Sequence, residues 1–155
     1  MSVVPASLTA VARHLLFIRE TLGPNRGYWV EWLQRQFGGI PGDSWCAYFV
    51  SLVLEIAYMG DPPLHGTGST KTLLAQATTK GYRLPEGTPP QPEDLYFFVS
   101  LPEGIPHHVG IVTGVNPLTG IAGNTSPDGK SANGTGVFEH ALHETPNLVL
   151  VRLPR

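Results

Sequence analysis

The segment from residue 45 to residue 59 constrains the fold most, because it is an apolar run without proline or glycine. The proline-glycine pair at 41–42 breaks whatever precedes it, and Asp43 or Ser44 can cap the first free backbone N–H groups of a helix. The run is apolar nearly all round, so we expect a helix that is buried on most of its faces. Cys46, the only cysteine of the sequence, then lies in the first turn of this helix.

A cysteine in the first turn of a helix is well placed to act as a nucleophile. The free N–H groups and the positive end of the helix dipole stabilise a thiolate, so we expect the pKa of Cys46 to be lowered. The alternative is a small buried apolar side chain, the commoner role of a single cysteine. Aromatic side chains next to Cys46 are placed to wall a cleft. Our candidate substrate-binding residues are Trp45, Tyr48, Trp29 and Ser44.

Composition predicts one domain over residues 1–155. Hydrophobic residues make up 41% and charged residues 14%, which excludes a disordered chain, while 18 glycines and 15 prolines indicate many loops. The net charge of −2, without a basic run, argues against nucleic acid and anionic membranes as partners. A single cysteine excludes an intrachain disulfide and a cysteine-based zinc site. We expect no metal and no cofactor.

The first twenty residues have no basic stretch before an apolar one, and no apolar run approaches the roughly 18 residues of a membrane span. We therefore expect neither a signal peptide nor membrane insertion. The protein is expected to be made in the cytoplasm, and a target outside it would be reached by another route.

The first half of the chain has the periodicity of helices and the second half that of strands. We expect helices over 7–22, capped by Ser7, and over roughly 26–37, capped by Asn25, and a short helix that begins after Ser69. The second of these carries a broad aromatic face, which we interpret as core rather than as a sugar-stacking platform. Its members are Tyr28, Trp29, Trp32, Leu33 and Phe37. About five strands follow from residue 95 and predict an antiparallel meander, hence an α+β fold.

The segment HHVGIVTGV carries the only histidines embedded in a strand-like pattern. Successive side chains of a strand point to opposite faces, so His107 and His108 cannot both face the helix. His108 shares its face with Gly110 and Val112, small side chains that would let a helix N-terminus approach. We assign the general base to His108 and place His107 in solvent or loop packing.

Asn124 is the candidate that orients the imidazole. A neutral histidine base needs its second ring nitrogen held by an acceptor, and an asparagine carbonyl serves without adding charge. Asn124 lies sixteen residues after His108, an even number, so a symmetric hairpin puts both on one face. The alternative is a turn residue. His140 and His143 have one-turn helical spacing, but they follow a strand pattern, so a metal pair there is disfavoured.

These residues form a recognisable set. PGDSWCAYFV, followed by HHVGIV and then GN, resembles the CHAP family of cysteine amidohydrolases and peptidases, within the papain-like NlpC/P60 group. NRGYWVEWLQRQFGG, PEDLYFF and SANGTGVFEH also look like segments of phage-type CHAP lysins, and the resemblance covers most of residues 20–140. It implies a papain-like fold and cleavage of an amide bond in peptidoglycan. That bond is either the muramoyl–L-alanine bond or one within the peptide stem or cross-bridge.

The resemblance implies roles for three residues. Cys46 would be the nucleophile, His108 the base and Asn124 the orienting group. Many members carry a glutamate two residues before this asparagine, where the present chain has Ala122. The third role therefore falls on Asn124 or on a residue not yet identified. Action on the wall would follow lysis-associated release or non-classical export.

Two other classes remain open from the sequence. One is a papain-like protease or deamidase effector that acts on protein, which would have an immunity or delivery partner. The other is a catalytically silent wall-binding domain.

Overall fold

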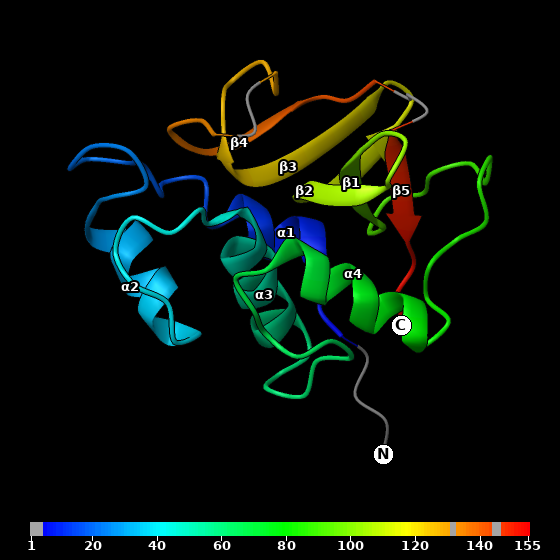
Figure 1. Cartoon of the computed structure of the whole chain (residues 1–155), viewed down its shortest axis with the longest axis horizontal. Coiled ribbons are helices and arrows are strands. Elements are labelled where there is room, and N and C mark those ends of the chain that lie inside the picture. Colours follow the sequence, from blue (N-terminus) through cyan, green and yellow to red (C-terminus); the bar gives the residue numbers. More distant parts are fainter. Residues whose placement is uncertain (1–4, 131–132, 144–146) are drawn as a thin grey trace.

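The computed structural model describes residues 5–130, 133–143 and 147–155. Four helices and a five-stranded antiparallel sheet form an α+β fold, in agreement with the sequence-based expectation. Figure 1 shows the sheet lying over the helices, with α3 in the middle of the helical layer. In the described part of the chain, no helix is long and apolar enough to span a bilayer.

Helix α3 (Cys46–Ala57) is the centre of the helical layer. All of its residues except Glu55 and Ile56 are buried, as the apolar run predicts. The expected cap is wrong, because the helix begins at Cys46 and its N-cap is therefore Trp45, which makes no side-chain capping bond. Asp43 instead accepts hydrogen bonds from the Ile40 N–H and the Tyr48 hydroxyl, and so closes the preceding turn.

Two of the three other helices are shorter than the periodicity indicates. Helix α1 (Leu8–Arg13) stops well before residue 22, and the segment after it turns to place Arg19 in an isolated bridge with β4. Helix α2 (Tyr28–Gln36) begins after Gly27 rather than after Asn25. Helix α4 (Thr70–Thr79) follows Ser69 as predicted.

Two of the predicted caps are confirmed by hydrogen bonds. Ser7 Oγ accepts from the Ala10 N–H at 3.1 Å, and Ser69 Oγ accepts from the Thr72 N–H at 3.1 Å. Asn25 fails as a cap because it adopts φ +56° and its side-chain amide donates to the Gly42 carbonyl instead. It ties the two loops on either side of α2 together.

The sheet has the order β4-β3-β2-β1-β5. The strands are β1 (Leu95–Ser100), β2 (Ile105–Val115), β3 (Leu118–Thr125), β4 (Gly136–Ala141) and β5 (Leu148–Val151). The first four form the expected meander, whereas β5 pairs with β1 at the opposite edge. The expectation of a continuous five-stranded meander is therefore wrong at its last strand.

Side chains of the sheet alternate between two cores. We call the side that packs on the helices the helix face, and its buried residues are Leu95, Phe97, Val99, Val109, Ile111, Ile121, Val137 and Val151. We call the other side the outer face, and its buried apolar residues are Tyr96, Val112, Ala122 and Leu150, with Leu142 packed over them. Cys46 belongs to the core of the helix face.

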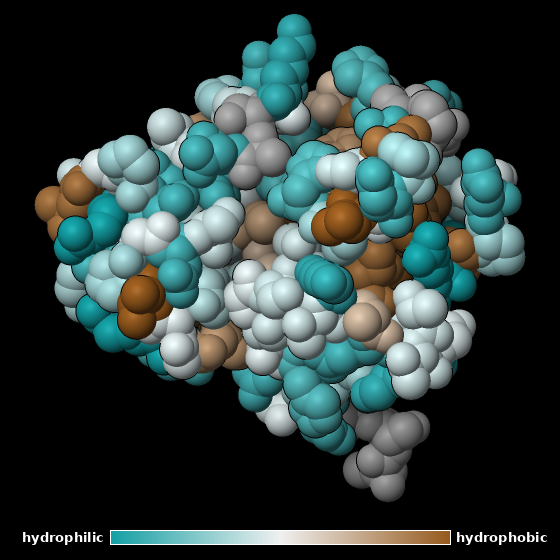
Figure 2. Space-filling model, in the orientation of Figure 1, coloured by the Kyte–Doolittle hydropathy of each residue, from teal (hydrophilic) through white to brown (hydrophobic). Residues whose placement is uncertain are grey.

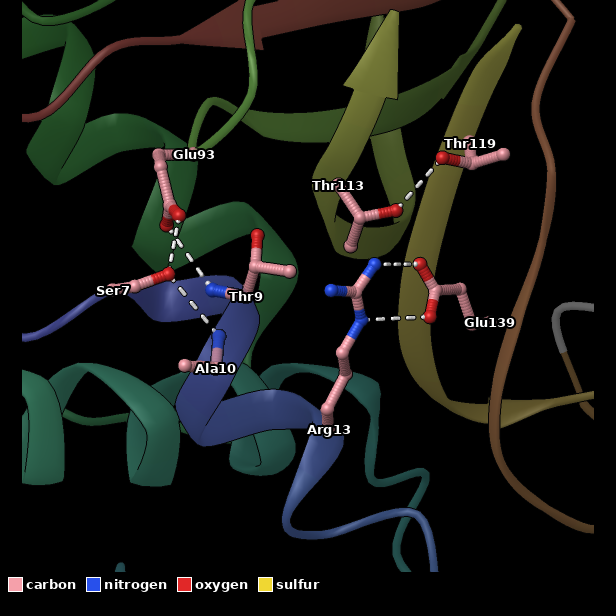
Figure 3. Close-up of polar contacts among 8 residues, drawn as sticks. All are labelled: Ser7, Thr9, Ala10, Arg13, Glu93, Thr113, Thr119 and Glu139. Atoms are coloured by element: carbon pink, nitrogen blue, oxygen red, sulfur yellow. Dashed lines mark hydrogen bonds and ion pairs between the residues drawn. The ribbon is translucent and has the colours of Figure 1, made fainter.

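Polar contacts fix α1 against the sheet and its preceding loop (Figure 3). Glu93 accepts from the Ser7 hydroxyl at 2.6 Å and from the Thr9 N–H at 3.1 Å. At the other end of the helix, Arg13 makes a two-pronged ion pair with Glu139 of β4, with N···O distances of 2.9 and 2.8 Å. The helix is thereby held at both ends, and the Ala6 N–H just before it donates to the Ala57 carbonyl at the C-terminal end of α3.

Candidate functional site

Cys46 is the first residue of α3 and is only 3% exposed. Its sulfur lies near the backbone N–H groups of Val109, Ala47 and Cys46 itself, which favour the thiolate. Burial acts in the opposite direction and is the larger effect, so the pKa of the Cys46 thiol is raised above its ordinary value. The expected lowering is therefore wrong: the helix terminus is present, but the loss of water around the sulfur outweighs it.

His108 is buried and His107 is exposed, as the alternation of β2 predicts. The face is not the one expected, however. Helix α3 packs against the helix face, which includes Val109, whereas His108 lies on the outer face with Gly110. Its ring stacks on Phe98 of β1, with centroids 6.0 Å apart and an interplanar angle of 14°. The alternation of side chains along β2 therefore predicts that His107 and His108 differ in burial. The small side chains on the His108 face do not mark the side on which the helix packs.

The Cys46 sulfur approaches the backbone of β2 next to His108, and it makes no hydrogen bond to the His108 side chain. Val109, whose N–H lies near the sulfur, directly follows His108 in the strand. Burial, together with the nearby charges of His140 and His107, lowers the pKa of His108 to about 3. At neutral pH the site therefore holds a neutral thiol and a neutral imidazole, and no hydrogen bond joins the two side chains in the described part of the chain.

Asn124 lies at the end of β3 beside this point. The pairing of Ile111 with Ile121 and of Val112 with Gly120, continued toward the start of β2, brings Asn124 opposite His108. A bulge between Ala122 and Thr125 interrupts the β3–β4 ladder here.

The conformation and contacts of Asn124 are unusual. Asn124 adopts φ +55°, the left-handed region that asparagine tolerates best after glycine. Its amide Nδ2–H donates to Ser44 Oγ at 3.0 Å, two residues before Cys46. The carbonyl Oδ1 is buried without a partner among the described residues. Asn124 therefore links β3 to the loop that enters α3.

The candidate substrate-binding residues separate into two groups. Trp45 is fully buried and its indole N–H donates to Glu20 at 3.1 Å, while Tyr48 is 7% exposed and bonded to Asp43. Both are structural in this arrangement, so the expectation that they line a cleft is wrong. Ser44 and Trp29 are exposed.

Trp29 belongs to an aromatic cluster on the surface of α2. Its ring centroid lies 5.5 Å from that of Phe17, 5.0 Å from Tyr28 and 5.9 Å from Trp32, in edge-to-face arrangements. Tyr28 is 70% exposed and Phe17 55%. The expectation that this face is core is therefore wrong for Tyr28 and Trp29, whereas Leu33, another member of the face, is fully buried.

Two residues near His108 were not singled out from the sequence. Tyr96 of β1 is fully buried beside His108, with ring centroids 6.3 Å apart. His140 was considered only as half of a helical metal pair, yet it lies in strand β4, where one-turn spacing to His143 has no meaning. No group of three or more His, Cys, Asp or Glu side chains suited to a metal occurs in the described ranges. A signal for Tyr96 existed in the glycines at 110 and 120, which leave room for a large ring.

A cavity of about 430 Å³ lies elsewhere, between the proline-rich segment 83–90 and the edge strand β5. Its lining includes Arg83, Glu86, Val99 and Leu150 and shares no residue with the Cys46 site. Apolar surface is visible beside β5 in Figure 2. The candidate catalytic residues are thus grouped at a closed point of the fold and not in this cavity.

The chain was compared with protein-family models and with curated proteins. No protein-family model matches the chain, and no curated protein is detectably similar to it.

Proposed function

We propose that this protein is a cysteine hydrolase of amide bonds, with Cys46 as nucleophile and His108 as general base. The observation that carries the proposal is the approach of the Cys46 sulfur to Val109 of β2, directly after His108. A helix N-terminus supplies the nucleophile, an adjacent strand supplies the base, and Asn124 on the next strand joins the same point. A nucleophile next to a base that a third group orients is the arrangement that covalent acyl transfer requires.

The protonation states decide how the reaction would begin. Both side chains are neutral at neutral pH, so the attack is assisted by a base and does not start from a preformed thiolate–imidazolium pair. As the Cys46 sulfur bonds to the amide carbon, the thiol proton passes to His108. The imidazolium then protonates the leaving amine as the C–N bond breaks. Water, deprotonated by His108, hydrolyses the thioester and restores the thiol.

The negative charge that develops on the amide oxygen needs hydrogen-bond donors. The first N–H groups of α3 have no partner within the helix, and those of Cys46 and Ala47 already lie near the sulfur. They are the donors we assign to the oxyanion. Loss of one such donor typically costs about 10²- to 10³-fold in rate.

The proposed substrate is bacterial peptidoglycan, and the reaction is either amidase cleavage at L-alanine or endopeptidase cleavage in the stem or cross-bridge. Support comes from the resemblance of PGDSWCAYFV, HHVGIV and GN to the CHAP segments and from an antiparallel sheet packed on a cysteine-bearing helix. A papain-like arrangement of these elements is part of the same proposal.

The test is digestion of purified peptidoglycan followed by mass spectrometric identification of newly freed amines. We expect a free L-alanine N-terminus, or a freed stem or bridge amine, with the native protein and no new amine with Cys46→Ala. Equal amine release by the two proteins would exclude Cys46 as the nucleophile. Absence of release by the native protein would refute the proposed substrate.

One observation favours a second candidate, a catalytically silent wall-binding domain. The Cys46 sulfur is buried in the core of the helix face and its pKa is raised, as for an inert structural cysteine. A sedimentation assay separates the two: the silent domain would bind insoluble peptidoglycan and release no amine.

A further inference from the structure

Three buried polar atoms lie where β1, β2 and β3 run side by side in the sheet. Tyr96 Oη, His108 Nδ1 and Asn124 Oδ1 have no hydrogen-bond partner among the described residues. Each of the three side chains is at most 2% exposed. Because buried polar groups in folded proteins are almost always hydrogen-bonded, these atoms on adjacent strands indicate a partner that they share.

Tyr96 carries its hydroxyl across β2 toward His108. Tyr96 pairs with Gly110. Phe98 pairs with His108 in the same ladder, so the phenol and the imidazole lie on one side of the sheet. A Cβ built at Gly110 would fall 2.3 Å from Tyr96 Oη, so the hydroxyl lies over Gly110 itself. Gly110 is two residues from His108, a step of about 7 Å along a strand, and the Tyr96 and His108 ring centroids are 6.3 Å apart. The hydroxyl is therefore a direct neighbour of the imidazole.

Asn124 faces the same imidazole from β3. The pairing of Ile111 with Ile121 sets the register of β2 and β3. Continued toward the start of β2, this register puts Asn124 opposite His108. The Asn124 Nδ2–H donates to Ser44 Oγ, so the atom left for the site is Oδ1, which can only accept.

The strands β2 and β3 are unpaired at this point. In the described part of the chain their ladder ends at Ile111 and Ile121, although both strands continue. The N–H of Val109, in the unpaired part of β2, lies near the Cys46 sulfur. Unpaired strands stand further apart than the 4.7–4.9 Å that is typical of a ladder, in agreement with the lack of a direct hydrogen bond from His108 to its neighbour on β3.

We propose that one structural water joins Tyr96 Oη, His108 Nδ1 and Asn124 Oδ1, and that Tyr96 is thereby a positioning residue for His108. A buried water typically makes about three hydrogen bonds, and three unpaired atoms are present. The water donates one hydrogen to Asn124 Oδ1 and the other to His108 Nδ1, and it accepts the hydroxyl hydrogen of Tyr96. Each of these hydrogens then has an acceptor, whereas a proton on Nδ1 would leave one buried hydrogen unpaired.

The water determines which ring nitrogen of His108 is the base. Nδ1 accepts from the water, so it carries no proton and Nε2 holds the one hydrogen of the ring. Only a bare nitrogen can take up a proton, so Nδ1 acts in the proposed reaction. In deacylation the water oxygen bonds to the thioester carbon, one water hydrogen passes to Nδ1, and the Cys46 sulfur leaves and takes that proton back. This catalytic role rests on the proposed function, but the water and the tautomer do not.

The first test is direct observation of the water and of the tautomer in the whole chain. A high-resolution crystal structure should show a water oxygen within about 3.2 Å of Tyr96 Oη, His108 Nδ1 and Asn124 Oδ1. The imidazole ¹⁵N resonances of His108 at neutral pH should show a bare Nδ1 and a protonated Nε2. A direct hydrogen bond between His108 and Asn124, a site without water, or a protonated Nδ1 would overturn the proposal.

Tyr96→Phe tests the positioning role, because it removes only the hydroxyl. Without this donor the water is held less firmly, so the Nδ1 resonance of His108 should move toward that of an imidazole nitrogen without a hydrogen bond. Tyr82→Phe is the matched control, since it removes the hydroxyl of a partly buried tyrosine and should leave the resonance unchanged. The same Nδ1 resonance in the native protein and in folded Tyr96→Phe would overturn the role of Tyr96.

A kinetic readout separates this inference from the proposed function. Acylation does not consume the water, so Tyr96→Phe should release the first equivalent of amine at nearly the native rate. Later turnovers should slow by about tenfold, the upper end of what one hydrogen bond typically contributes. Unchanged later turnovers would remove the catalytic role of the water. If the native protein releases no amine, the proposed function fails, while the crystal structure and the ¹⁵N resonances still decide on the water.

Discussion

The two faces of the sheet are closed by different means. On the helix face, Val109, Ile111 and the body of α3 surround Cys46 with hydrocarbon, and the thiol is neutral as a result. On the outer face, apolar residues are mixed with the phenol of Tyr96 and the imidazoles of His108 and His140, and each of these three groups has one polar atom without a partner among the described residues. One face thus holds the nucleophile rigidly, while the other carries the groups that can move protons. Their meeting point is the start of β2.

The largest effect expected on the helix face is that of removing the sulfur. Cys46→Ala should lower peptidoglycan hydrolysis by about 10³-fold or more, since loss of a covalent nucleophile removes the acyl-enzyme route. Stability should change little, because alanine keeps the helix start and leaves a cavity of only one atom. Chemical denaturation serves as the control. Retained hydrolysis would assign the chemistry to another residue.

The pH dependence of stability sharpens the comparison for the outer face. Burial lowers the pKa of His108 from 6.5 to about 3, so the unfolded chain binds a proton there that the folded chain does not. The free energy of unfolding should therefore fall as the pH is lowered from about 6.5 toward 3. His108→Gln should weaken this dependence and His107→Ala should retain it, as measured by urea unfolding at several pH values. Identical pH profiles for all three proteins would show that His108 is not buried in its neutral form.

Adding a methyl group to the core of each face should lower stability in both cases but should affect His108 only from the outer face. Gly110→Ala puts a methyl group against Tyr96 on the outer face, and Gly123→Ala puts one 2.7 Å from the Phe49 Cβ on the helix face. Each should lower the free energy of unfolding by about 1–3 kcal/mol. Only Gly110→Ala should move the ring resonances of His108. If Gly123→Ala moved them equally, the faces would not be independent.

The hydrogen bond between Asn124 of β3 and Ser44, just before α3, is expected to contribute modestly to the free energy of unfolding. A double-mutant cycle of Ser44→Ala and Asn124→Ala should give a coupling of about 0.5–1.5 kcal/mol, the typical net contribution of one hydrogen bond. Asn124→Gly should cost less than Asn124→Ala, because glycine adopts φ +55° without strain. A coupling of zero would mean that the Ser44 contact contributes nothing in solution.

The smallest effect is expected at the surface ion pair that fastens α1 to β4. The Arg13 side chain is 52% exposed, so Arg13→Gln should lower the free energy of unfolding by about 0.2–1 kcal/mol, and less at high salt. Thermal melting at two salt concentrations measures this. A loss above this range that is independent of salt would indicate that Arg13 acts through packing.

Much of the fold was predictable from local chemistry. Ser7 and Ser69 cap helices because a hydroxyl can reach a free N–H three residues on, and this needs no knowledge of the rest of the chain. The strands from residue 95 are likewise predicted from local sequence alone, through the alternation of apolar and polar residues. The position of β5 was not predictable, since either edge of a four-stranded meander can accept a fifth strand.

The site was less predictable, because it depends on three-dimensional burial. Alternation separates His107 from His108 but does not say which face meets the helix. The position of Cys46 at a helix start indicates a lowered pKa, whereas the pKa depends on how much water remains around the sulfur. Tyr96 is distant from His108 in the sequence and lies beside it only because β1 pairs with β2.

The most direct test of the account is to trap the acyl-enzyme. Native protein is mixed with a soluble peptidoglycan fragment, quenched in acid within the first turnovers and digested, and the peptide that contains Cys46 is weighed by mass spectrometry. The account predicts a thioester adduct on Cys46, with the mass of the acyl part of the fragment and a matching release of amine. Amine release with an unmodified Cys46 peptide at every quench time, or an adduct on any other residue, would contradict it.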